Sequence, residues 1–190
     1  MKNENVKNLA LSAMFIALGL VLPFVTGQIP QIGKMMLPMH IPVFLCGLIC
    51  GWKYGAIVGI ITPLLRSVAF GVPILYPTAI VMSVELMTYG LVIGFLYERS
   101  RWKCIFSLYR CLIIAMISGR LIKALTEIVL LGIGGDGFTY QSFVAGAFLN
   151  AIPGIIAQLI LIPVIMIALK RTGMVSFGNE KHKKPCCENN

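Results

Sequence analysis

The sequence predicts an all-α, polytopic membrane protein in which six transmembrane helices form one bundle. Of the 190 residues, 58% are hydrophobic and 12% are charged, whereas a typical soluble domain has about 45–50% apolar and about 25% charged residues. The mean hydropathy is +0.88. A soluble fold of this size cannot bury so much apolar surface in one core. Apolar segments of about 20 residues, the length that crosses a bilayer as a helix, recur along the chain.

The first apolar segment spans residues 6–26. Lys2 and Lys7 precede it, as in a signal peptide, but the segment is longer than a signal peptide's apolar region and no small-x-small cleavage site follows. We therefore expect a retained helix. Residues 27–42 contain three prolines, two glycines and a lysine, which predicts a structured loop rather than a helix.

The apolar stretch 43–70 is too long for one upright span. Trp52, Lys53 and Tyr54 place a charge between two aromatic rings in its middle, which is typical of a membrane interface. This predicts a short helix followed by a longer one. Prolines at 73 and 77, the polar break 98–103 and the glycine-rich turn 132–138 delimit the later helices. The helices after the first loop are expected at 43–51, 54–70, 78–97, 104–133 and 143–169.

The distribution of lysine and arginine predicts that both termini lie in the cytoplasm. Six spans place both termini on one side, and twelve of the 16 basic residues fall there. The opposite loops hold Lys34, with Arg66 near a helix end. The net charge of +9 thus reflects orientation and contact with anionic lipid, and no nucleic-acid partner is predicted. The twelve are Lys2, Lys7, Lys53, Arg99, Arg101, Lys103, Arg110, Lys170, Arg171, Lys181, Lys183 and Lys184.

Ionisable residues inside a bilayer are costly and mark candidate functional sites. The predicted helices contain Arg66, Glu85, Arg120, Lys123 and Glu127. Counted along the helices, these residues and Asn150 fall in the outer half of the membrane. Lys123 and Glu127 lie within about 60° of Arg120 on one helix face, so this face should line a cavity filled by water or ligand.

The five ionisable residues carry a formal charge of +1. We expect the extra positive charge to meet an anionic group, such as a carboxylate, on a small solute. In the alternative interpretation, the five charges only pair with one another and hold the helices together. His40, between Pro38 and Pro42, could add a hydrogen-bond donor or could be an interfacial histidine in a rigid turn.

Other sequence features predict packing rather than chemistry. Small residues four apart let transmembrane backbones approach closely, and this spacing recurs at Gly47, Gly51, Gly55 and Gly59 and again at Gly90 and Gly94. No nucleophile–base pair is visible and Asp136 is the sole aspartate. We therefore predict no enzyme activity, no cofactor and no metal site, and we expect the six cysteines to be reduced thiols.

This combination resembles the substrate-binding S component of an energy-coupling factor (ECF) transporter. Residues 13–17, AMFIA, are similar to the AxxxA motif through which S components dock on a shared coupling subunit. Residues 37–67, LPMHIPVFLCGLICGWKYGAIVGIITPLLRS, look like the second and third helices of the family. The resemblance covers residues 6–170.

The resemblance implies a binding subunit for a water-soluble vitamin or related micronutrient, in the plasma membrane of a bacterium. S components bind their solute with high affinity near the extracellular side and topple in the membrane when coupled to an ATP-driven module. The implied partners are a transmembrane coupling subunit, which would dock at Ala13 and Ala17, and its two ATPase subunits. Residues 27–42 and 132–142 would be lids over the solute.

The resemblance also implies roles for the polar residues within a substrate-binding domain at 1–170. The polar composition of residues 171–190 predicts a disordered cytoplasmic tail. Arg66, Arg120 and Lys123 would hold an anionic group of the solute. Glu85, Glu127 and Asn150 would orient these residues or bond the solute, and His40 would add a donor.

The solute itself stays open at this stage. Residues 37–67 are most similar to the pantothenate-type branch, whose carboxylate suits the extra positive charge. Folate, niacin, riboflavin and a queuosine precursor are the other candidates. A different class of function is an autonomous, proton-coupled carrier with Glu85 or Glu127 as the proton site, although no inverted repeat is visible.

Overall fold

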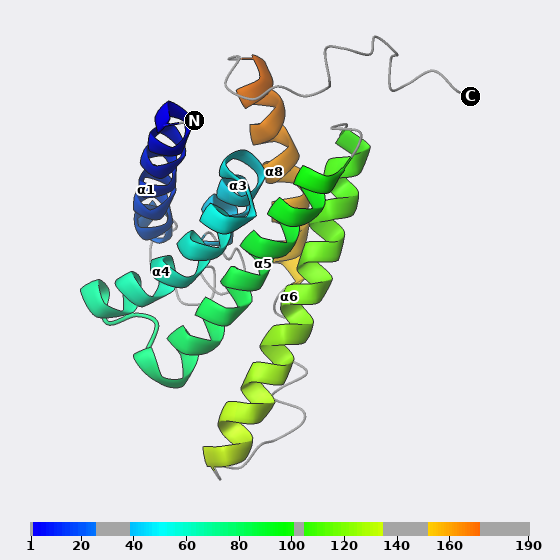
Figure 1. Ribbon diagram of the computed structural model, residues 1–190. Helices are drawn as coiled ribbons and strands as arrows, with labels where there is room; N and C mark the ends of the chain where they lie inside the picture. Colours follow the sequence, from blue (N-terminus) through cyan, green and yellow to red (C-terminus); the bar gives the residue numbers. More distant parts are fainter. Residues whose placement is uncertain (1, 26–38, 101–104, 135–151, 172–190) are drawn as a thin grey trace.

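The computed structural model describes residues 2–25, 39–100, 105–134 and 152–171 (Figure 1). These residues form six α-helices and one short turn, η1, in which Tyr76 is extended (φ −122°, ψ 131°). The described part of the chain is therefore all-helical, as predicted. The elements in chain order are α1 (Lys2–Val25), α3 (His40–Cys50), α4 (Trp52–Phe70), η1 (Leu75–Ala79), α5 (Ile80–Arg99), α6 (Ile105–Gly134) and α8 (Ile152–Arg171).

Four segments of the described residues are long and apolar enough to cross a membrane, which identifies a polytopic membrane protein. They are Asn5–Phe24, Trp52–Phe70, Leu75–Arg99 and Ile105–Leu130. Two shorter apolar helices, His40–Cys50 and Gly154–Leu169, complete the set in the described residues. Residues 143–151 of the sixth predicted helix lie outside the described residues, as does the tail from residue 172 onward.

The predicted break near Trp52 is present. Gly51 separates α3 from α4 with a φ of 93°, a backbone conformation that glycine adopts without steric cost. The start of α3 differs from the prediction, because residues 40–42 are helical rather than part of the loop. Pro42 does not prevent this, since proline is tolerated in the first turn of a helix. The rest of the predicted loop, 27–38, lies outside the described residues.

Helix α5 lies at the centre of the packing. It contacts α3, α4 and α6, while α1 packs on α3 and α4, and α8 packs on α6 and α3. The core between these helices includes the fully buried side chains of Phe44, Leu86, Ile93, Leu108 and Leu112. A polar side chain on α5 can therefore be reached from several helices at once.

Glycines allow α3, α4 and α5 to approach closely. A Cβ atom on Gly47 would lie 2.8 Å from the carbonyl oxygen of Gly90, and one on Gly55 would lie 2.9 Å from that oxygen. A Cβ atom on Gly59 would lie 2.5 Å from the carbonyl oxygen of Leu86. These contacts confirm that Gly47, Gly55 and Gly59 serve helix packing, whereas a Cβ atom on Gly51 would meet no atom within 4 Å.

The Gly90→Ala variant tests this close approach. Its Cβ would collide with the backbone carbonyl of Gly55, so we expect a loss of about 1–3 kcal/mol in stability. Without such a collision, alanine would stabilise the helix by about 1 kcal/mol relative to glycine. A loss of stability therefore indicates the collision, and a gain indicates its absence. The measurement is the thermal unfolding midpoint in detergent, with Phe95→Leu on the exposed face of α5 as control. A midpoint equal to or above that of the wild type would contradict the close packing.

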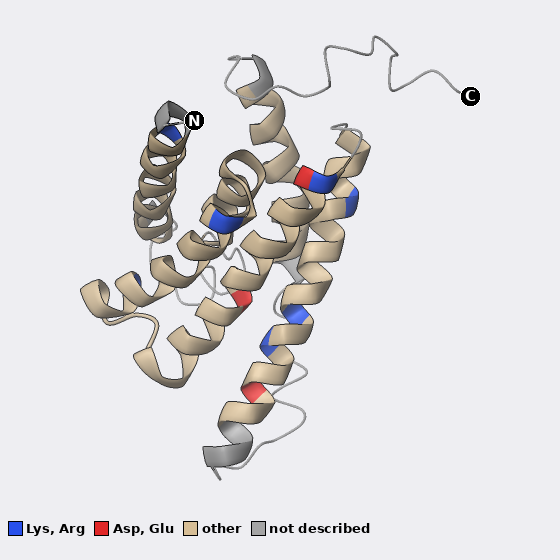
Figure 2. Cartoon of the chain, in the orientation of Figure 1, with Lys and Arg blue, Asp and Glu red and all other residues tan. Residues whose placement is uncertain are grey.

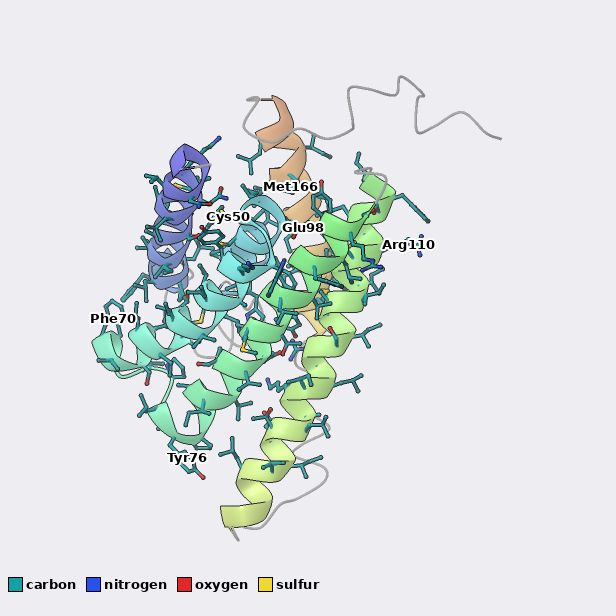
Figure 3. All side chains as sticks on the ribbon, in the orientation of Figure 1. Cys50, Phe70, Tyr76, Glu98, Arg110 and Met166 are labelled. Carbon is teal, nitrogen blue, oxygen red and sulfur yellow. The ribbon has the colours of Figure 1, made fainter. Side chains whose placement is uncertain are left out.

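The start of α1 and the end of α8 lie at the same end of the bundle (Figure 1). Cys50, Glu98 and Arg110 lie toward that end, and Phe70 and Tyr76 lie toward the other (Figure 3). Figure 2 shows charged residues near the first end and a second group midway along α5 and α6. The second group is the candidate site.

Candidate functional site

A buried carboxylate joins α5 to α6. Glu85 on α5 is 1% exposed, and its Oε1 lies 3.3 Å from Nη1 of Arg120. Its Oε2 lies 3.5 Å from Nζ of Lys123. Arg120 and Lys123 therefore pair with different oxygens of the Glu85 carboxylate. A buried charge needs such partners because it has lost its contacts with water.

Tyr89 and His40 complete the surroundings of this carboxylate. The Tyr89 hydroxyl donates a hydrogen bond of 2.7 Å to Oε1 of Glu85, and Nε2 of His40 lies 3.9 Å from the same oxygen. The Tyr89 ring centroid is 5.4 Å from that of His40 and 5.0 Å from that of Phe44. We call Glu85, Tyr89, His40, Arg120 and Lys123 the Glu85 cluster.

The pattern of α6 explains how two cations come to face α5. Leu108, Leu112 and Ala115 form a fully buried apolar stripe. The same face reaches Lys123 about two turns beyond Ala115, and Arg120 lies to one side of it. Between the stripe and the two cations, a Cβ on Gly119 would overlap the ring of Tyr89. The glycine thus leaves room for the tyrosine ring between the helices and places its hydroxyl at Glu85.

The Glu85 cluster brings together four of the predicted site residues, Glu85, Arg120, Lys123 and His40. Tyr89 was missed, although its position one helical turn after Glu85 is the spacing at which helix side chains meet. Within the cluster, two basic side chains face one carboxylate. Glu127 follows one turn beyond Lys123 and is half-buried, and it forms no ion pair with the described residues within 4 Å.

Arg66 occupies a different place from the one expected. Its Nε donates to the Val72 carbonyl at 3.1 Å and its Nη1 donates to the Leu20 carbonyl at 3.3 Å. Gly71 ends α4 in the left-handed conformation, with its N–H bonded to the Ser67 carbonyl at 2.9 Å. This reversal brings the Val72 carbonyl back to Arg66, which therefore ties α4 to α1 and is not an ion-pair partner of Glu85 in the described residues.

Several predicted site elements fall elsewhere in the chain. Asn150 lies outside the described residues, as do residues 26–38 and 135–151, which hold most of the two predicted lids. Among the described residues, no group of three or more His, Cys, Asp or Glu side chains could hold a metal ion. Cys46, Cys50 and Cys111 are free thiols.

The AxxxA segment lies on the outward face of α1. Ala13 and Ala17 are exposed, one turn apart, whereas Ser12 and Phe15 are buried against the bundle. Small side chains on an exposed transmembrane face leave a shallow surface on which a second helix can pack closely. The surface is separate from the Glu85 cluster, which lies between α3, α5 and α6.

The sequence matches the family described as "ECF transporter, substrate-specific component" over residues 7–166, most of the chain. No curated protein matches the chain, and no solved structure matches it. Members of this family are multi-pass proteins of the cell membrane that bind a substrate and work with an ECF energising module. With its apolar helices and buried cationic cluster, the chain belongs to this family of S components, which are transport subunits and not enzymes.

Proposed function

We propose that this S component binds a water-soluble vitamin or related micronutrient that carries a carboxylate, with pantothenate as the leading candidate. The observation that carries the proposal is the excess of cationic groups in the Glu85 cluster. Arg120 and Lys123 share the single carboxylate of Glu85. A second carboxylate, supplied by the solute, would balance this charge.

The exposed fractions of the side chains distinguish Arg120 and Lys123, which would hold the solute, from Glu85, which would orient them. Glu85 is 1% exposed, whereas the side chains of Arg120 and Lys123 are 10% and 18% exposed. Glu85 is thus the inner group, and the two cations offer their remaining donors to a solute. An arginine has five N–H donors and a lysine three, so both can keep their contact with Glu85 while they bind a second anion.

The remaining predicted residues take lesser roles in the proposal. Glu127 and Asn150 would orient the cations or bond neutral groups of the solute. Arg66 already donates to two backbone carbonyls, so its role would be to hold α4 against α1 rather than to bind the solute.

We further propose that both termini are cytoplasmic and that the Glu85 cluster therefore lies in the outer half of the membrane. The first residues of α1 and the last of α8 share one end of the bundle, and Lys7, Lys53, Arg99 and Arg110 fall close to helix ends. The bias of basic residues toward the cytoplasm supports this orientation. The coupling subunit, with its two ATPase subunits, would dock at Ala13 and Ala17.

Arg120→Ala is expected to weaken binding of the solute carboxylate by about 100-fold. Loss of a charge-assisted, partly buried contact has an effect of this order, about 2–3 kcal/mol. The measurement has two steps. Mass spectrometry first identifies the small molecule that co-purifies with the wild-type protein, and calorimetry then compares its binding to both proteins.

Arg110→Ala is the matched control, because Arg110 is an exposed arginine on the same helix, toward the end of the bundle. It should bind like the wild type. A co-purifying solute without a carboxylate, or normal binding by Arg120→Ala, would refute the proposed site. Uptake into vesicles that contain no ATPase partner would instead favour a secondary carrier.

A further inference from the structure

Helix α8 carries a buried glutamine, Gln158. Gln158 is 2% exposed, and its Nε2 has no hydrogen-bond partner among the described residues. Both ring nitrogens of His40 also lack a hydrogen-bond partner among the described residues, although Nε2 of His40 lies 3.9 Å from Glu85. A buried donor without a partner destabilises a protein, so each such group in a native structure needs an explanation.

Helix α8 packs on two helices that carry residues of the Glu85 cluster, and Gln158 lies on its buried face. Helix α8 contacts α6, which carries Arg120 and Lys123, and α3, which begins at His40. Gln158, Ile162 and Met166 are each buried and four residues apart, so they share the inward face of α8.

Gln158 and His40 both precede, along their helices, a residue that lies toward the same end of the bundle. Cys50 on α3 and Met166 on α8 lie toward the same end of the bundle (Figure 3). Counting back from these residues, His40 lies about 15 Å and Gln158 about 12 Å farther along its helix, at a rise of about 1.5 Å per residue.

We propose that Gln158 contacts the solute and donates from Nε2 to a neutral oxygen of it, such as an amide carbonyl or a hydroxyl. This inference rests on the proposed function, in which Arg120 and Lys123 hold the solute carboxylate. An amide N–H₂ offers only donors, whereas a neutral imidazole offers one donor and one acceptor and so suits a hydroxyl. The solute class is therefore a carboxylate that also carries amide or hydroxyl groups.

The stability of the solute-free protein separates this role from a structural one. If Gln158 supported the fold through a hydrogen bond, Gln158→Leu would lower the melting temperature. If its Nε2 is reserved for the solute, leucine removes a buried unpaired donor, so the change is neutral or stabilising. We expect the solute-free Gln158→Leu protein to melt at or above the wild-type temperature.

Binding of pantothenate, a carboxylate with an amide and hydroxyl groups, provides the second readout. We expect Gln158→Leu to weaken its binding to the purified full-length chain about tenfold. Ile160→Ala is the matched control on the exposed face of α8 and should bind normally. Unchanged pantothenate binding by Gln158→Leu, or a lowered melting temperature without solute, would overturn the inference.

Failure of this inference can be distinguished from failure of the proposed function. Nicotinate has a carboxylate but neither amide nor hydroxyl. Nicotinate should therefore need Arg120 but not Gln158. Pantothenate binding that needs Arg120 but not Gln158 would overturn the inference and leave the carboxylate site standing. If the wild type binds neither probe, the proposed solute class fails. The melting temperature of the solute-free protein needs no probe. A melting temperature of Gln158→Leu below that of the wild type would in that case overturn the inference.

Discussion

Replacing Ala13 and Ala17 together by phenylalanine is expected to abolish solute uptake by cells while solute binding by the purified chain stays unchanged. Both alanines lie on the exposed face of α1, so larger side chains there do not disturb the core. Transmembrane helices associate through close packing of small residues. Two phenylalanines one turn apart would hold the coupling subunit's helix away from α1. The measurements are uptake of labelled solute in cells that contain the complete ECF module, and binding by the isolated subunit.

Ile113 and Ile117 provide the control for this variant. They are exposed on α6 and have the same four-residue spacing. Their replacement by phenylalanine adds bulk to a different outward face and should leave both uptake and binding intact. Loss of binding in the Ala13→Phe, Ala17→Phe protein would refute a pure docking role, and undiminished uptake would place the docking surface elsewhere.

Glu85→Leu is expected to destabilise the protein by about 3–5 kcal/mol. Glu85 is 1% exposed and is the shared partner of Arg120 and Lys123, so its removal leaves two neighbouring cations without an anion. The Tyr89 hydroxyl also loses its acceptor. The thermal unfolding midpoint in detergent, measured without solute, checks the expectation. A midpoint close to that of the wild type would show that the cluster contributes little to the fold.

Two further variants separate charge from shape at this position. Glu85→Gln keeps an oxygen that can accept from Tyr89 and Arg120 but loses the charge, so it should melt between the wild type and Glu85→Leu. Adding Lys123→Met to Glu85→Gln removes one of the two uncompensated cations. The double variant should therefore be more stable than Glu85→Gln alone. If it is less stable, Lys123 contributes packing rather than repulsion.

The helices were predictable because their signals are local. A run of about 20 apolar residues crosses a bilayer wherever it occurs. The break at Gly51 followed from a charge and two aromatic rings in the next three positions. The start of α3 was less predictable, since prolines at 38 and 42 indicate a loop but a proline is also tolerated in the first helical turn.

The candidate site was predictable only in part. A charged residue within an apolar segment can be recognised in any sequence, and this criterion identified Glu85, Arg120 and Lys123 as candidates. Arg66 met the same criterion, yet it serves two backbone carbonyls because Gly71 turns the chain back toward it. Tyr89 and Gln158 were overlooked because uncharged polar residues are common in transmembrane helices, and only burial and bonding partners distinguish these two.

The sequence by itself determined that this is a helical membrane protein, where its helices run, and which charges lie within them. These properties depend on the free energy of transferring each segment from water to lipid, and this free energy is a sum over residues that are neighbours in the sequence. The tertiary structure alone decided which charges meet. Glycine contacts set how closely α3, α4 and α5 approach, and Gly119 sets the contact of α6 with Tyr89 on α5. These contacts bring His40, Glu85, Arg120 and Lys123 together while Arg66 stays with α1. Distances between helices arise from side-chain packing across the bundle, which no local pattern in the chain records.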